Sequence, residues 1–341
     1  MSDRETLQLM RQSAGRWAKE RGSRWASKLN ASKDSSVLAA AMDDIGDQGW
    51  LPASLDEWGD CPALTLCHLG RALAQEAPAL FLPILTNWIG LNLLNPRSQP
   101  ADSERPGPIA ASPYIDCSLT EATVIASPRG QDWVLDGTVH WVINAQARSR
   151  LSVVAKVPSG ATALFGIGLP HSGCALSEPL VLLGLWGLPV HHVKLSSAAV
   201  GEGSLVAVDQ EARKRLKAGY RTARWGTFGM LSGFSDSLLE QAKAYAVVRM
   251  QGGRQIIDHP PVRQLIDTAQ VAAESFHRWL DHLEQYPNSD CSLAEMRREG
   301  LRASDSALQF FVGTGYICPG LPERCWRDVR QTATLCSDRS A

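Results

Sequence analysis

Hydrophobic side chains recur every three or four residues through the first hundred positions, which is the spacing of amphipathic helices. Two such apolar stripes are Leu7, Met10, Ala14 and Trp17, and Leu66, Leu69, Leu73 and Ala77. Pro78 ends the second stripe, and Pro96 disfavours the helical conformation of Asn95 before it. The pattern predicts an N-terminal helical domain over residues 1–107.

The period changes to that of short strands between residues 108 and 207. Apolar and β-branched side chains fill residues 151–157, 162–168 and 191–195, with Gly and Pro between these runs. Asp136 and Gly137 lie between two further β-rich runs, and this dipeptide favours a tight hairpin turn. We therefore expect a small β-domain over residues 108–207, with a hairpin turn at Asp136 and Gly137.

Helical spacing returns after residue 208. It is clear between Phe228 and Val248 and again over residues 262–283, a segment that follows two prolines suited to a first helical turn. A third helix is expected from Leu293 to Phe311, because Ser292 and Glu295 have capping-box spacing. The fold class is thus α + β, with a C-terminal helical bundle over residues 208–341.

Composition narrows the possible classes of function. The 34 basic and 35 acidic side chains leave a formal net charge of −1, so no overall field favours nucleic acid or an anionic membrane. The polar start of the chain lacks the apolar run of a signal peptide, and the apolar stretch 79–94 is interrupted by Pro83 and polar residues. We expect a cytoplasmic protein that binds neither nucleic acid nor membrane.

The eight cysteines indicate reduced thiols rather than a metal site or disulfides. None of them shows the CxxC spacing of a zinc site, and only Cys61, Cys67 and His68 lie close together in the sequence. A zinc site needs a second cluster of ligands, which the sequence does not provide. We predict no metal ligand.

Three segments of the C-terminal region carry a family resemblance. Residues 245–253 read Tyr-Ala-Val-Val-Arg-Met-Gln-Gly-Gly, residues 309–316 read Gln-Phe-Phe-Val-Gly-Thr-Gly-Tyr, and residues 323–328 read Glu-Arg-Cys-Trp-Arg-Asp. In this order and separation they resemble motifs of the acyl-CoA dehydrogenase family. The resemblance implies FAD as cofactor, with Arg249, Gln251, Gln309 and Gly313 at the pyrophosphate and adenine end of an FAD held by a neighbouring subunit.

The flavin-ring motifs of that family are only partly retained. Residues 136–144 resemble the family's Asn-Gly-x-Lys-x-Trp-Ile-Thr-Asn, in which the tryptophan and threonine lie against the flavin. Trp141 and Asn144 match, but Ile143 replaces the hydroxyl-bearing threonine. Of the family's Thr-Glu-Pro-x-x-Gly-Ser-Asp, residues 111–118 keep only Pro113.

The catalytic carboxylate of the family is missing from both of its usual positions. A base is expected eight residues after the Arg-Asp pair, where this chain has Cys336, or 26 residues before the bundle arginine, where it has Ala223. Asp338 and Glu240 are the acids that could act as a displaced base. The sequence therefore predicts no catalytic residue in the usual positions.

These losses lead to three hypotheses about function. The chain resembles the short subunit of heterotetrameric (α2β2) acyl-CoA dehydrogenases that act on steroid side chains in bacteria, in which an unlike subunit supplies the base. This favours a subunit of a heteromeric FAD-dependent enzyme that desaturates an acyl-CoA, inactive by itself. The alternatives are a self-sufficient flavoenzyme with a displaced base, and a non-enzymatic acyl-CoA-binding or structural subunit.

Three glycines leave one structural question open. Gly226, Gly229 and Gly233 are spaced so that they could widen a pocket for a bulky substrate or allow close helix packing. We expect helix packing.

Overall fold

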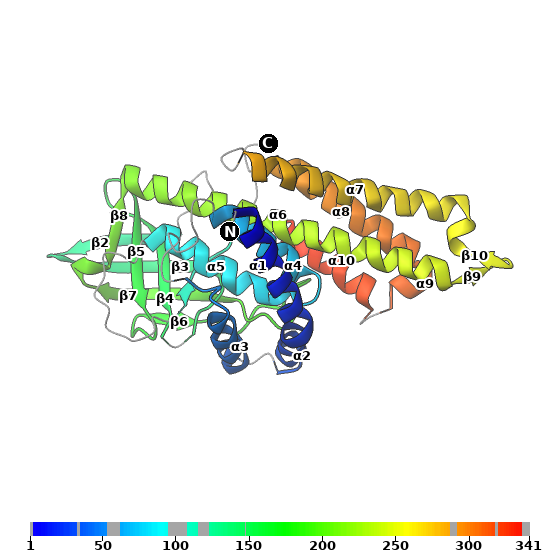
Figure 1. Ribbon diagram of the computed structural model, residues 1–341. Coiled ribbons are helices and arrows are strands. Elements are labelled where there is room, and N and C mark those ends of the chain that lie inside the picture. The colour runs from blue at the N-terminus through cyan, green and yellow to red at the C-terminus, as the bar shows by residue number, and fades with distance from the viewer. Residues whose placement is uncertain are drawn as a thin grey trace.

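The molecule has helices at both ends of the chain and a β-sheet between them. The computed structural model describes residues 3–32, 35–52, 62–94, 108–114, 123–146, 148–286, 292–317 and 320–335. The sheet lies at one end of an elongated molecule and the bundle of long helices reaches the other, with the N-terminal helices between and beside them (Figure 1). The N-terminal helical elements are α1 (Asp3–Trp17), a π-helical turn (Ala18–Gly22), α2 (Ser23–Ser32), α3 (Ser35–Asp47), α4 (Pro62–Ala74) and α5 (Pro78–Leu94).

The middle of the chain forms one mixed sheet of eight strands. In sequence they are β1 (Ile109–Ala110), β2 (Val124–Arg129), β3 (Asp132–Val142), β4 (Arg150–Lys156), β5 (Thr162–Gly168), β6 (Cys174–Leu176), β7 (His191–Val200) and β8 (Leu205–Val208). Their spatial order is β6-β7-β3-β2-β4-β5-β8, and β1 pairs with β4. Small and apolar side chains of β2, β3, β4, β5 and β7 form a separate core within this domain.

The C-terminal part is a bundle built around one helix of 40 residues. Its elements are α6 (Asp209–Val248), β9 (Met250–Gln251), β10 (Arg254–Gln255), α7 (Pro260–Gln285), α8 (Leu293–Phe310), α9 (Val312–Gly315) and α10 (Leu321–Thr332). Helix α6 runs from the β-domain to the far end of the bundle, where β9, β10 and α9 lie (Figure 1). The expected α + β class, with helical regions on both sides of a small β-domain, is confirmed.

Two details of the sequence interpretation have different outcomes. The expected capping box is present, because Ser292 Oγ accepts a hydrogen bond from Glu295 N at 3.3 Å where α8 begins. The expected hairpin turn at Asp136 and Gly137 is wrong. These residues lie inside β3, and the turn between β2 and β3 is made by Gly130 and Gln131.

Gly137 is needed for a reason other than a turn. Its φ is +137°, and a Cβ atom there would lie 2.2 Å from the carbonyl oxygen of Thr123. Asp136 lies opposite a bulge of β7, where its Oδ1 accepts a hydrogen bond from Ser197 N at 2.7 Å. The dipeptide therefore tolerates unusual backbone geometry, but as part of a bulge between paired strands.

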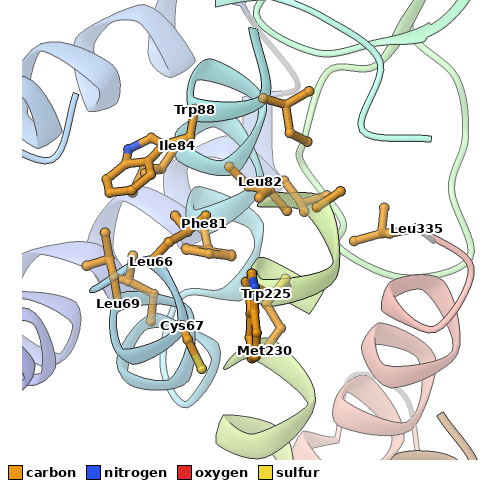
Figure 2. Packing of buried hydrophobic residues seen from close by; sticks show 14 of the residues in the cluster. Leu66, Cys67, Leu69, Phe81, Leu82, Ile84, Trp88, Trp225, Met230 and Leu335 are labelled. Atoms are coloured by element: carbon orange, nitrogen blue, oxygen red, sulfur yellow. The ribbon is translucent and has the colours of Figure 1, made fainter. Parts of the chain in front are cut away.

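The main core lies where α4, α5 and α6 meet. Side chains from these three helices, together with Leu335, point into one buried cluster (Figure 2). The glycines of α6 permit the close contact, because a Cβ at Gly229 would lie 2.2 Å from Cys67 O and a Cβ at Gly233 would lie 2.3 Å from Arg71 O. At Gly226, the space of the missing side chain is occupied by Leu85 of α5. The three glycines therefore serve close helix packing, as expected.

Strand β1 is fastened to α5 by two buried amides. Asn87 Oδ1 accepts a hydrogen bond from Ile109 N at 2.9 Å, and Asn144 Nδ2 donates to Pro83 O at 2.9 Å. The side chain of Ile109 fills the space over Gly90, where a Cβ would lie 2.2 Å from Ile109 Cγ2. These contacts fix the β-domain against the N-terminal helices.

A polar seam on α4 joins the N-terminal helices to the bundle. Arg71 Nε donates to Asp236 Oδ2 on α6 at 2.7 Å, and His277 Nε2 on α7 lies 2.8 Å from Asp236 Oδ1. One turn earlier, His68 is buried with its Nε2 3.3 Å from Glu284 Oε1. Burial lowers the pKa of His68 to about 4, and the charges of Arg11 and Arg71 add to this effect.

Within the described parts of the chain, no helix combines the length and the apolar character needed to cross a bilayer. Helix α5 is highly apolar, yet its side chains are almost all buried by α4, α6 and the sheet.

We expect Gly229→Ala to destabilise the protein by about 2–4 kcal/mol, because the new methyl group meets the backbone of α4 rather than a movable side chain. Gly15→Ala is the matched control. Position 15 is helical and has no atom within 4 Å of its Cβ site, so alanine there should be neutral or stabilising by up to about 1 kcal/mol. Urea unfolding monitored by circular dichroism measures both changes. Equal midpoints for the two variants would contradict the packing role of Gly229.

The buried His68 predicts a specific pH dependence of stability. Its pKa is about 4 in the folded protein and 6.5 in the unfolded chain, so the unfolded state binds more protons between these values. This contribution is fully present above pH 6.5 and falls by about 3 kcal/mol as the pH drops to 4. In His68→Gln that part of the loss should disappear, as measured by unfolding free energies from pH 4 to 7.5. The same pH profile in both proteins would exclude this source.

Candidate functional site

The four residues predicted to meet FAD all lie at the far end of the bundle. Arg249 follows the last turn of α6, Gln251 belongs to β9, Gln309 lies near the end of α8, and Gly313 is in α9. All four are exposed. The fold brings together three segments that are up to 64 positions apart in the sequence (249 to 313) at one surface, named here the bundle tip.

An aromatic cluster holds the bundle tip together. The ring of Tyr245 lies 5.1 Å from that of Phe311 and 6.0 Å from that of Phe310, which joins the end of α6 to the end of α8. The side chain of Gln309 donates from Nε2 to the hydroxyl oxygen of Tyr316 at 2.9 Å. The backbone of α9 is therefore placed beside the end of α6 by buried packing.

The strands β9 and β10 form a tight hairpin at this tip. Gly252 and Gly253 are its two turn residues, with φ of +60° and +79°, a geometry that glycine adopts without strain. His259 Nε2 lies 3.1 Å from the carbonyl oxygen of Gln251, which ties the hairpin to the start of α7. Gly252 and Gly253 thus allow the chain to reverse direction directly after Gln251.

The charge at the bundle tip favours an anionic ligand. Arg249, Arg254 and Arg263 are exposed there, and Arg263 is paired with Asp258 at 3.5 Å. Within the described parts of the chain, the guanidinium of Arg249 makes no ion pair and no side-chain hydrogen bond. Arg249 is therefore available to a phosphate or carboxylate.

A second polar region lies where the β-domain meets the end of α10. Trp141, the tryptophan of the flavin-ring motif, is 40% exposed in a bulge of β3, with its ring 5.5 Å from that of Tyr114. The hydroxyl of Tyr114 accepts a hydrogen bond from Gln331 Nε2 at 2.8 Å. Burial raises the pKa of Tyr114, against hydrogen bonds with Thr334 and Gln331 that lower it.

Ile143 and Asn144 do not offer polar groups at this surface. The side chain of Ile143 is buried in the main core, and its backbone pairs with Ala111. Asn144 is also buried, and its Nδ2 donates to Pro83 O and Ile109 O. Ile143 and Asn144 of this motif therefore stabilise the packing of the β-domain against α5 and β1.

Comparison with known proteins gives a consistent fold and distant relatives. No protein-family model matches the chain. A glutaryl-CoA dehydrogenase from Mycobacterium smegmatis, solved in complex with FADH2, superposes with a TM-score of 0.81 over 97% of this chain and 91% of that one, at 15% identity. The chain has an acyl-CoA dehydrogenase-like fold. An electron transferring flavoprotein structure from Acidaminococcus fermentans is also similar, with a TM-score of 0.77 over 96% of this chain and 92% of that chain, at 16% identity.

Two curated proteins are similar to the chain at the level of sequence. The 3-sulfinopropanoyl-CoA desulfinase of Cupriavidus necator is 24% identical over 67% of this chain and 62% of its own length. The human mitochondrial short-chain specific acyl-CoA dehydrogenase is 25% identical over 62% of this chain and 54% of its own length. The chain thus matches little more than half the length of these relatives.

The structure describes two of the positions considered for a catalytic base, Ala223 and Glu240. Ala223 is fully buried in α6, where its carbonyl oxygen accepts a hydrogen bond from Thr227 Oγ1 at 2.8 Å. Glu240 is exposed on α6 and therefore does not point into the core. Cys336 and Asp338 lie outside the described residues.

The Glu-Arg-x-x-Arg-Asp motif has a structural role that the sequence did not indicate. Arg327 stacks over the ring of Trp186 at 3.5 Å, donates from Nη1 to Leu183 O at 3.0 Å, and is paired with Glu323. Asp328 Oδ1 accepts a hydrogen bond from Leu185 N at 2.5 Å. The motif therefore binds α10 to the loop between β6 and β7, and only the spatial contact with that loop reveals this.

Asp328 predicts a pH dependence of the opposite sign to that of His68. Burial raises its pKa to about 6, although Leu185 N, Arg324 and Arg327 lower it. Protonation thus favours the folded state, and this contribution to stability falls by about 2 kcal/mol as the pH rises from 4 through 6. In Asp328→Asn, which keeps an oxygen for Leu185 N, the loss should vanish. Unfolding free energies of both proteins at pH 4, 6 and 8 test this, and parallel profiles would contradict it.

Proposed function

We propose that this chain is a subunit of a heteromeric FAD-dependent acyl-CoA dehydrogenase, and that it contributes FAD-binding groups without the usual catalytic glutamate. The observation that carries the proposal is the contrast between its two polar regions. Among the described residues the bundle tip presents an exposed, unpaired Arg249, whereas the motif around Trp141 has an apolar Ile143 where the resembled motif has a threonine.

The residues of the bundle tip fit the phosphate end of FAD. The Arg249 guanidinium is free to form a fork of hydrogen bonds with pyrophosphate oxygens, and Gln251 and Gln309 add exposed amides. No atom of the described residues lies within 4 Å of the Cβ site of Gly313, so a ligand can approach the backbone of α9 there. We assign these four residues to an FAD held mainly by a neighbouring subunit.

The surroundings of the bundle tip also fit a protein partner. Val248, Met250 and Ile317 are 73%, 56% and 61% exposed beside the predicted FAD-binding residues. Large apolar side chains grouped on a surface favour burial against another chain. This supports a site that is completed by a neighbouring subunit.

The region around Trp141 does not fit the flavin ring in the way that the family motif implies. Ile143 replaces a hydroxyl with a buried apolar side chain, and the amide of Trp141 already donates to His192 Nδ1 at 3.3 Å. We infer that an unlike acyl-CoA dehydrogenase subunit supplies the flavin-ring pocket and the catalytic base. When bound there, FAD would accept the hydride removed from the acyl-CoA.

The identity of the acyl group rests on the sequence resemblance alone. That resemblance favours a steroid side chain as the acyl-CoA substrate. The glycines that could have widened a pocket for it, Gly226, Gly229 and Gly233, are filled by Leu85 and by the backbone of α4. They therefore lend no support to a bulky substrate in this chain.

The proposal predicts that flavin is retained only after assembly. We expect the purified chain to show little absorbance near 450 nm, and a flavin spectrum with acyl-CoA dehydrogenase activity to appear on co-expression with an acyl-CoA dehydrogenase-like chain encoded beside it. In that complex, Arg249→Ala should weaken FAD binding by roughly 10- to 100-fold, because a charge-assisted hydrogen bond to phosphate is lost. Equilibrium dialysis against FAD measures the change.

The matched control is Arg278→Ala, which removes an exposed arginine of α7 whose Nη2 contacts only Ser275 Oγ among its described hydrogen bonds. Its FAD affinity should equal that of the parent complex. A homomeric preparation with full flavin content and turnover would overturn the heteromeric proposal. Equal FAD affinity in the Arg249 and Arg278 variants would remove Arg249 from the site.

A further inference from the structure

Two histidines face each other across a bulge beside Trp141. His140 lies on β3 and His192 on β7, and the strand pairing shifts here so that His140 and Trp141 together oppose His192. Trp141 adopts a φ of +59° in this bulge. The bulge therefore turns two imidazoles, 52 positions apart in the sequence, toward the same point.

The distance between the Nδ1 atoms of the two imidazoles equals that between two nitrogens bound to one metal ion. His140 Nδ1 and His192 Nδ1 are 3.3 Å apart, and the ring planes are inclined by 81°. Two nitrogens bound to one zinc ion at about 2.05 Å in tetrahedral geometry are separated by about 3.3 Å. We propose that His140 and His192 form a two-nitrogen binding site for a divalent cation of the Zn²⁺ or Ni²⁺ class, with water filling the other coordination positions.

The protonation states required by such a site are accessible. His192 Nδ1 accepts a hydrogen bond from Trp141 N at 3.3 Å, and a cation bound at this nitrogen would replace that hydrogen bond. Lys194 follows two residues later on β7, but it is exposed and its charge is screened by solvent.

The backbone around the pair is well supported. His192 N donates to Ser177 Oγ at 2.9 Å, and Val139 pairs with Val193 on the two strands. A rigid support lowers the ordering cost of bringing two ligands to one ion. Among the described residues no cluster of three or more His, Cys, Asp or Glu side chains could hold a metal ion, so this site has two protein ligands.

Metal binding here would act on Trp141. The indole ring lies 5.3 Å from the ring of His192, and its backbone is part of the bulge that carries His140. A cation joining β3 to β7 would fix this bulge. Metal binding is therefore expected to hold Trp141 in a fixed position on this surface. This expectation does not depend on the proposed enzyme function.

Calorimetric titration of the purified chain with ZnCl₂ at pH 7.5 tests the site. We expect one equivalent whose affinity drops about tenfold or more in both His140→Gln and His192→Gln, because each variant converts a chelate into a single ligand. Ni²⁺ should quench part of the tryptophan fluorescence of the parent, and this part should be absent from Trp141→Phe. The matched control is His282→Gln, which removes an exposed histidine of α7 and should bind Zn²⁺ as the parent does.

Several outcomes would overturn the proposal. Unchanged affinity in both pair variants, loss in only one of them, or equal loss in His282→Gln would each mean that the metal binds elsewhere or to single surface histidines. Circular dichroism checks that the variants fold. If one does not, electron paramagnetic resonance of Cu²⁺ bound to the parent decides the question, because the pair requires two coordinated nitrogens and a spectrum with fewer excludes it.

Discussion

The close contact between α4 and α6 is the constraint on which the rest of the structure depends. Gly229 and Gly233 of α6 lie against the carbonyl groups of Cys67 and Arg71, so the two helices approach at backbone distance. This contact brings Arg71 within reach of Asp236 and places α5 over the same core (Figure 2). With α6 fixed in this way, one end of the helix meets the β-domain and the other carries the bundle tip.

The two ends of the molecule differ in how their polar groups are used. Around Trp141, several polar groups bond within the chain, as Tyr114 does with Gln331 and Asn144 Nδ2 with Pro83 O. At the bundle tip, Arg249 is exposed and unpaired among the described residues. A surface that leaves a cation and several apolar side chains exposed is suited to a ligand and a partner. This difference is the physical basis for proposing a division of labour between unlike subunits.

The C-terminal motifs have two kinds of role that a sequence motif alone does not separate. The charged groups of Arg327 and Asp328 bind other parts of the chain. Arg327 contacts the ring of Trp186 and Leu183 O, and Asp328 accepts a hydrogen bond from Leu185 N. Arg249 belongs to a neighbouring motif and makes no such contact among the described residues. The spacing of these residues along the sequence matches one family pattern. Only their contacts in the folded chain distinguish a residue that holds two elements together from one that can bind a ligand.

The sequence by itself determined the order of helices and strands and the cap at Ser292, because helix period and capping are local properties. The choice of Arg249 and Gln309 as candidate residues came from the family resemblance and stays a prediction. It misplaced the turn at Asp136 and Gly137, since a dipeptide that tolerates unusual φ suits a bulge as well as a turn, and only the pairing of β3 with β2 and β7 decides between them. The meeting of His140 with His192, and the packing of the α6 glycines against α4, depend on contacts between distant segments. Tertiary structure alone decided them.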